Sequence, residues 1–184
     1  MLEVELKSVV DDVPARRAAV EAAGGKLVYE GRLLDVRYDR MDRALMIRDH
    51  VLRLRVYESG NSRRGSLDWK GETRYENGFK LREELSTAVD DPDVLRQIIE
   101  RLMYVETSEI DRKIAQYELG GVTVRFEQYP EMDALVEIEG SPDSIEDVIS
   151  RIGMPRSGFT SERLLDFALR YQARTGRPAR LNWK

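Results

Sequence analysis

The sequence contains no cysteine and only one histidine, His50, among 184 residues. The absence of cysteine excludes disulfides, cysteine-ligated zinc and thiol catalysis, and it is compatible with a reducing cytoplasmic compartment. A catalytic serine activated by histidine would have to use His50, and no motif in the sequence supports that role. Walker-type phosphate loops and glycine-rich dinucleotide fingerprints are also missing. The candidates for chemistry are therefore carboxylates, lysines and arginines.

Long hydrophobic runs are also missing. No stretch of about 18 apolar residues occurs, and the N-terminus lacks the basic start and apolar run of a signal peptide. We therefore expect a soluble, cytoplasmic protein without a membrane partner. The formal net charge of −4 argues against general nucleic-acid binding driven by bulk charge. A chain of 184 residues with 41% hydrophobic content suits one domain with a sizeable core.

The first seven residues alternate apolar and charged side chains with period two, which is typical of a β-strand with one apolar face. Glu3, Glu5 and Lys7 therefore point the same way. Two carboxylates about 7 Å apart on one face of a strand can share a hard divalent cation. The lysine beyond them can bind an anion that this cation also touches. The alternative interpretation is a strand with one solvated face.

The same alternation recurs along the chain, and its polar positions are mainly Arg, Lys, Asp and Glu. The further runs are residues 52–56, 67–70, 81–85, 122–127 and 136–139. Because a solvated face more usually carries Thr, Ser, Gln and mixed charges, we expect these charged faces to meet one another. Charges removed from water must be paired or must bind charged ligands. The sequence therefore favours a charged interior that binds a polyanion with divalent cations, and a self-paired lattice of salt bridges is the alternative.

Helix and turn signals divide the rest of the chain. Aspartate or serine caps followed by proline, and a capping sequence at Thr160, predict helices at residues 11–23, 90–103, 141–152 and 160–175. Residues 26–30 and 34–38 are predicted as separate strands, and residues 41–50 are predicted as a short helical or irregular segment. Residues 59–65 have the composition of a mobile hairpin loop. A hairpin is predicted between residues 67–72 and 79–86 across Asn77-Gly78.

A second hairpin is expected to have a defined register. Residues 113–119 and 122–128 flank Gly120-Gly121, which is a two-residue turn signal. A tight turn there places Leu119 opposite Val122, and the same register pairs Tyr117 with Val124 and Ala115 with Phe126 on an apolar face. The opposite face then carries Arg112, Ile114, Gln116, Glu118, Thr123, Arg125 and Glu127.

These elements predict one α+β domain over residues 1–184. An antiparallel sheet with its apolar face outward under helices and its charged face inward is best closed as an eight-stranded β-barrel. The motif-bearing barrel would occupy residues 1–139, a helical segment residues 141–176 and a tail residues 177–184. The sequence leaves open whether Trp183 in this tail packs on the domain or contacts a partner.

Five motifs, in order over residues 1–139, resemble those of the CYTH family, also called triphosphate tunnel metalloenzymes. Glu3-Val4-Glu5-Leu6-Lys7 matches the ExExK motif, and Leu52-Arg53-Leu54-Arg55 matches the LRxR strand. Lys70 matches the following lysine. Arg82-Glu83-Glu84 matches the next basic and acidic motif, and Val136-Glu137-Ile138-Glu139 matches the late ExE strand. The resemblance implies an eight-stranded antiparallel tunnel that binds the triphosphate chain.

The resemblance also implies roles for individual residues. The metal ligands for Mg²⁺ or Mn²⁺ would be Glu3, Glu5, Glu137 and Glu139. The triphosphate would be bound by Lys7, Arg53, Arg55, Lys70, Arg82, Arg112 and Arg125. Catalytic roles would fall to Lys7, Arg112 and Glu127.

Members of this family differ in the group that attacks phosphorus. The implied substrates are ATP, thiamine triphosphate and tripolyphosphate, either hydrolysed or, for ATP, cyclised to cAMP and pyrophosphate as in class IV adenylate cyclases. Cyclase-like members usually have lysine at Arg112, aspartate at Glu127 and a further arginine at Ile114, and they usually read Ser-Tyr at Ser161-Glu162. Hydrolysis is thus at least as well supported as cyclisation. A non-catalytic module that binds polyphosphate or nucleotide is the alternative, and a homodimer stays open.

Overall fold

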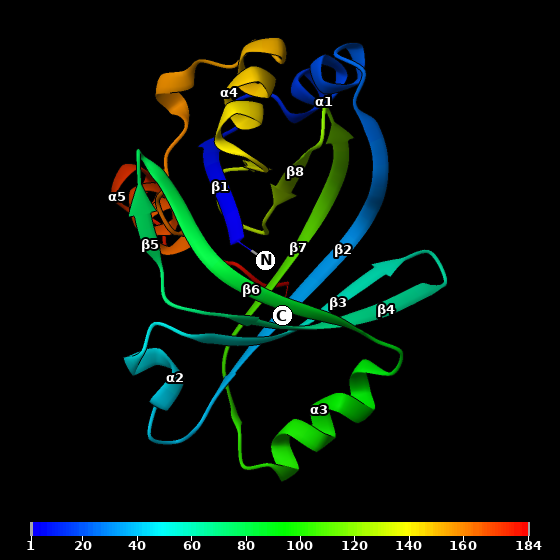
Figure 1. The fold of residues 1–184 in the computed structure, drawn as a ribbon, viewed down its shortest axis with the longest axis vertical. Helices are drawn as coiled ribbons and strands as arrows, with labels where there is room; N and C mark the ends of the chain where they lie inside the picture. The colour runs from blue at the N-terminus through cyan, green and yellow to red at the C-terminus, as the bar shows by residue number, and fades with distance from the viewer. Residues whose placement is uncertain (1, 184) are drawn as a thin grey trace.

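The computed structural model describes residues 2–183, and its central feature is one antiparallel sheet that closes on itself (Figure 1). The strands are β1 Leu2–Val9, β2 Lys26–Asp39, β3 Val51–Ser59, β4 Ser62–Lys70, β5 Arg74–Glu76, β6 Phe79–Val89, β7 Val105–Leu119, β8 Val122–Gln128 and β9 Leu135–Glu139. Their order is β1-β9-β8-β7-β2-β3-β4-β6, and β6 pairs back onto β1. This closure confirms the predicted eight-stranded α+β barrel, and β5 adds one strand beside β6.

The helices lie outside the barrel. They are α1 Val13–Ala22, α2 Ala44–Ile47, α3 Pro92–Arg101, α4 Pro142–Arg151 and α5 Leu164–Thr175, with a 3₁₀ turn at Arg156–Gly158. In Figure 1, α1 and α4 lie at one end of the molecule and α3 lies at the other. Within residues 2–183, no helix is long and apolar enough to cross a membrane.

Side-chain caps begin α1, α3 and α4 as the sequence predicts. The carboxylate of Asp12 accepts from the Ala15 amide, and Asp91 and Ser141 cap α3 and α4 in the same way. The fourth predicted helix is wrong at its start, because α5 begins at Leu164 and not at residue 160. The backbone of Thr160 instead exchanges two hydrogen bonds of 2.8 Å with Lys7, which holds it extended beside β1.

Strand β1 divides the apolar layer from the charged interior. Val4 and Leu6 are buried in the largest hydrophobic cluster, which also contains Ile145 and Ile149 of α4. The alternate side chains of β1 point into the barrel. The period-two pattern therefore places the apolar side of this strand under α4 and its charged side on the lumen.

The predicted register of the β7–β8 hairpin is confirmed. Leu119 pairs with Val122, and Tyr117 with Val124, in the observed ladder. Both glycines of the turn have positive φ, 60° for Gly120 and 80° for Gly121, as a two-residue hairpin requires. This register puts Arg112, Arg125 and Glu127 together on the inner face.

Three expectations about the middle of the chain are corrected in part. Residues 26–30 and 34–38 belong to the single strand β2, which has a bulge between Leu27 and Tyr29. Residues 59–65 belong to the predicted hairpin, but its connection is a tight turn and not a mobile loop, because Gly60 adopts φ 56° and the β3–β4 ladder extends to the pair Ser59–Ser62. The predicted antiparallel pairing of residues 67–72 with 79–86 is confirmed by the β4–β6 ladder, but Asn77-Gly78 directly joins β5 to β6, so β5 lies within the connection.

The C-terminal tail packs on the barrel. The Asp111 amide donates to the Leu181 carbonyl at 2.8 Å. The ammonium of Lys113 lies 5.4 Å from the centre of the Trp183 ring, a distance at which a cation and an aromatic face attract. The tail therefore lies along β7.

We expect Leu6→Ala to lower the free energy of unfolding by about 3 kcal/mol, because it leaves a cavity in the layer between β1 and α4. Leu6 is fully buried, whereas Leu2 on the same strand is 59% exposed. Urea denaturation of Leu6→Ala and the control Leu2→Ala measures the difference. Equal effects of the two substitutions would contradict the burial of Leu6 beneath α4.

Candidate functional site

The inner face of the barrel carries an unusual number of buried charges. The charged side chains at this face with less than a tenth of their surface exposed are Glu3, Glu5, Lys7, Asp35, Arg53, Arg55, Asp68, Arg82, Arg112, Arg125, Glu127 and Glu137. Strand alternation and register bring them together from all parts of the sheet. Since an isolated buried charge is strongly unfavourable, each of them needs a counter-charge or a ligand.

One part of this site is built from β1, β9 and β8. In the ladder, Glu5 lies opposite Glu139, and Lys7 lies opposite Glu137. The ammonium of Lys7 pairs with Glu5 at 2.7 Å and also with Glu137. Arg125 of β8 pairs with Glu137 from the other side. Lys7 and Arg125 therefore neutralise the carboxylates that the sequence predicts as metal ligands.

Lysines from β4 and β6 neutralise the acids of β1. Lys70 donates to both carboxylate oxygens of Glu3 at 2.6 Å, and Lys80 pairs with Glu5. Burial alone would raise the pKa of Glu5, but Lys7 and Lys80 lower it well below its usual range. Glu5 is therefore ionised at neutral pH.

A second part of the site surrounds Asp35 of β2. Its carboxylate accepts from Arg55 at 2.8 Å and from Arg112 at 3.1 Å, and Arg53 approaches to 3.5 Å. Burial would raise the pKa of Asp35, but these arginines, led by Arg55, lower it well below its usual range. One carboxylate thus fixes three guanidinium groups, two from β3 and one from β7.

Asp68 and Glu127 hold the outer members of this arginine group. Asp68 accepts from Arg53 Nη2 at 2.8 Å. Glu127 accepts from Arg112 Nε at 2.9 Å and from the hydroxyl of Tyr129 at 2.5 Å. Burial would raise the pKa of Glu127, but Arg112 and then Arg125 lower it to about 2. Glu127 is therefore an anion that orients Arg112, and it is a weak proton acceptor at neutral pH.

Apolar packing lies beside Glu127. Phe167 of α5 belongs to one cluster with Ile110, Tyr129 and Leu135. The hydroxyl of Tyr129 is the only polar group of these four side chains, and it donates to Glu127. This packing excludes water from one side of the carboxylate.

Arg82 differs from the other predicted phosphate ligands. Its Nε donates to the Gly71 carbonyl at 2.8 Å, and its Nη2 reaches the carbonyls of Gly71 and Asp49. Burial lowers the pKa of this guanidinium. Its positive charge is thus held in the site by carbonyl oxygens, without a carboxylate at salt-bridge distance in residues 2–183.

The structure places all the predicted site residues on the inner face, and it adds four that were not predicted: Asp35, Arg37, Asp68 and Lys80. The added residues alternate with apolar neighbours in the sequence, so strand parity alone could have found them. None of the four matches a motif of the CYTH resemblance, on which most of the predicted site residues depend.

The donor chemistry of the site fits a hard divalent cation, since Glu3, Glu5, Glu137 and Glu139 offer only carboxylate oxygens. The side chain of Glu139 makes no ion pair or hydrogen bond with residues 2–183. Burial raises the pKa of this carboxyl, Arg125 opposes this and nearby Glu3 adds to it. No group of three acidic or histidine side chains in residues 2–183 is already arranged around a cation position.

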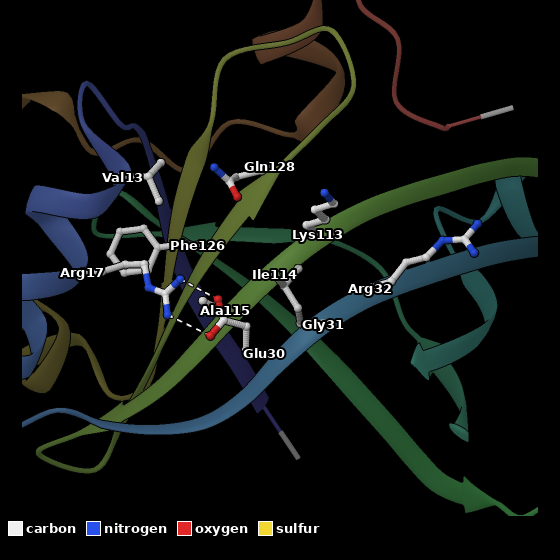
Figure 2. Close-up of a pocket in the computed structure, with 10 residues that line it drawn as sticks. All are labelled: Val13, Arg17, Glu30, Gly31, Arg32, Lys113, Ile114, Ala115, Phe126 and Gln128. Atoms are coloured by element: carbon white, nitrogen blue, oxygen red, sulfur yellow. Dashed lines mark hydrogen bonds and ion pairs between the residues drawn. The ribbon is translucent and has the colours of Figure 1, made fainter. Parts of the chain in front are cut away.

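A separate cavity of about 240 Å³ lies on the outer face, between α1 and strands β2, β7 and β8 (Figure 2). Arg17 on its wall is paired with Glu30 at 2.6 Å, and Ala115 and Phe126 belong to the apolar side of the sheet. This cavity is therefore distinct from the charged lumen.

Comparison with known proteins agrees with this architecture. The family model described as CYTH domain matches residues 1–150. The chain belongs to the CYTH family. A Methanocaldococcus jannaschii protein named "Putative adenylate cyclase" is 27% identical over 146 residues, which cover 79% of this chain and 80% of that protein.

Two solved structures share the fold at low sequence identity. One, from Vibrio parahaemolyticus, is named "putative adenylate cyclase" and has a TM-score of 0.76 at 16% identity, covering 91% of this CYTH chain and 97% of its own. The other, from Hippeastrum, has a TM-score of 0.64 at 15% identity and covers 98% of both chains. It is named as an adenylyl cyclase homologue that "reveals a dominant triphophatase activity".

The lowered pKa of Glu127 predicts acid sensitivity. The ionised carboxylate of Glu127 makes its full contribution to the free energy of unfolding above pH 4.5, the pKa of this group in the unfolded chain. This contribution is lost as the pH falls toward about 2, its pKa in the folded protein. We expect the loss of unfolding free energy between pH 7 and pH 3 to be smaller in Glu127→Gln than in the wild type, by about 2 kcal/mol. Urea denaturation at both pH values measures this. The exposed control Glu76→Gln should follow the wild type, and parallel curves for all three proteins would contradict the assigned ion pairs.

Proposed function

We propose that this CYTH protein is a metal-dependent enzyme that binds a triphosphate in its charged lumen and acts on the phosphate chain. One observation carries the proposal. Nitrogens of three inner-face guanidinium groups, Arg37 Nε, Arg112 Nη1 and Arg125 Nε, are buried without a hydrogen-bond partner in residues 2–183. Buried donors of this kind are rare and call for an explanation, and an oxyanion ligand supplies one.

Triphosphate binding requires an exchange of ionic partners. The ammonium groups of Lys7, Lys70 and Lys80 are paired with Glu3, Glu5 and Glu137. When a polyanion enters, these cations turn from carboxylate to phosphate oxygens. The carboxylates of Glu3, Glu5 and Glu137, together with Glu139, would then be available to hold Mg²⁺ or Mn²⁺. Each charge keeps a partner throughout, which suits a buried and water-poor site.

The bound metal supplies Lewis-acid stabilisation of charge on phosphate oxygens. The residues of the chain do the rest. Arg53, Arg55 and Arg112, fixed by Asp35, stabilise the negative charge of the phosphoryl group as bonds form and break. Their geometry is set before the substrate binds, because Asp35 already accepts from Arg55 at 2.8 Å and from Arg112 at 3.1 Å.

Hydrolysis is the favoured reaction. Cyclisation requires a proton acceptor for the ribose hydroxyl, but Arg112 keeps its proton at all ordinary pH values and Glu127 is a weak base. Water as the nucleophile needs less activation when the phosphoryl charge is neutralised. Cyclisation of ATP to cAMP and pyrophosphate is the second candidate, because the M. jannaschii relative carries an adenylate cyclase name.

Phosphorus NMR tests the proposal directly. The purified protein is incubated with Mg²⁺ or Mn²⁺ and, in parallel, with ATP, thiamine triphosphate and tripolyphosphate. Orthophosphate from any of them establishes hydrolysis and identifies the preferred substrate, whereas cAMP with pyrophosphate establishes cyclisation. Metal-dependent binding without any product would overturn the proposed enzymatic activity and would indicate a non-catalytic binding module.

We expect Glu5→Gln to reduce turnover by on the order of 100-fold, because it removes one metal-binding charge while keeping the side-chain volume. Calorimetric titration should still detect triphosphate binding by this variant. Glu100→Gln, at an exposed position of α3, is the matched control and should retain wild-type turnover. If Glu5→Gln changes only the melting temperature, Glu5 belongs to a structural ion-pair lattice.

A further inference from the structure

Arg37 is a basic residue of the lumen whose position is fixed by two neighbouring strands. In the β2–β3 ladder it lies directly opposite Arg53, and in the β2–β7 ladder it lies opposite Ser108. It shares the inner face of β2 with Asp35, two residues earlier. Two guanidinium groups therefore face each other across adjacent strands, an arrangement that is unfavourable unless an anion lies between or beside them.

The guanidinium of Arg37 has no protein partner. Its Nε is buried without a hydrogen bond, and none of its nitrogens makes an ion pair or hydrogen bond with residues 2–183. The adjacent arginines are held in place, since Asp68 binds Arg53 and the Gly71 carbonyl binds Arg82. Arg37 can therefore bind a ligand without giving up an existing contact.

The surroundings of Arg37 are positively charged. Burial lowers its pKa, and Arg53, Arg82 and Arg112 lower it further, while Asp35 opposes them. Asp35 is already occupied by Arg55 and Arg112. The unliganded protein thus carries an electrostatic strain that a bound anion would relieve.

We propose that Arg37 binds a phosphoryl group of the substrate together with Arg53 and Arg82, and that it increases affinity for the triphosphate at the expense of the stability of the unliganded protein. This inference rests on the proposed function. Guanidinium groups from β2, β3 and β6 would then contact one phosphoryl group, and a planar guanidinium suits paired phosphate oxygens.

The test is calorimetric titration of tripolyphosphate, in the presence of Mg²⁺, into the full-length wild type and two variants, Arg37→Gln and Arg37→Lys. We expect Arg37→Gln to weaken binding by about tenfold or more, and Arg37→Lys to recover part of the loss. Without ligand, Arg37→Gln should melt a few degrees above the wild type, because a buried cation has been removed from like charges. A residue with a structural ion pair would change the melting temperature in the opposite direction.

Arg40→Gln is the matched control, since Arg40 follows the same strand but is 61% exposed and lies 3.8 Å from Asp42. It should bind tripolyphosphate like the wild type. Unchanged tripolyphosphate binding by Arg37→Gln would overturn the role of Arg37. A melting temperature of unliganded Arg37→Gln below that of the wild type, or an unfolded variant, would also overturn it. Failure of the wild type to bind tripolyphosphate would instead overturn the proposed function, so the two failures are distinguishable.

Discussion

The charge balance of the barrel lumen is the constraint on which the rest of the structure depends. Alternation along each strand forces acids and bases into a space with little water, where an unpaired charge is far more unfavourable than at the surface. The protein meets this constraint with carboxylates that each bind several cations. Asp35 contacts Arg53, Arg55 and Arg112, so its loss would remove one ionic partner from all three at once.

Under the proposed function, this balance would link stability to ligand binding. In the unliganded protein, lysines of the lumen neutralise carboxylates that a metal would otherwise need, and arginines retain buried donors without partners. Proteins commonly give up stability at a binding site in this way. The apolar layer outside compensates, because Leu6, Tyr117 and Ile138 are fully buried in one continuous cluster beneath the helices. The lumen can thus be optimised for a ligand while the outer layer maintains the fold.

Much of this could be predicted from the sequence, because a strand in a barrel has only two faces. The period-two pattern assigned Glu3, Glu5 and Lys7 to the lumen, and the Gly120-Gly121 turn fixed the β7–β8 register. Other features depend on contacts distant in sequence. The extended backbone at Thr160 results from its pairing with Lys7, and the missing partner of Arg37 follows from which cations Asp35 binds. The local secondary-structure propensity of the sequence predicts neither of these two features. The roles assigned to the site residues remain predictions.

The closure of the barrel by β1 also constrains how the protein folds. β1 pairs with β9, and Glu5 lies opposite Glu139 in that ladder, so β1 is synthesised before β9 and waits for it before this edge is covered. Contacts this distant in sequence form slowly. Until they form, one edge of β1 is open to water and its alternating charges discourage pairing with other chains. The alternating charges that line the finished lumen therefore also protect an incompletely paired β1 from aggregation.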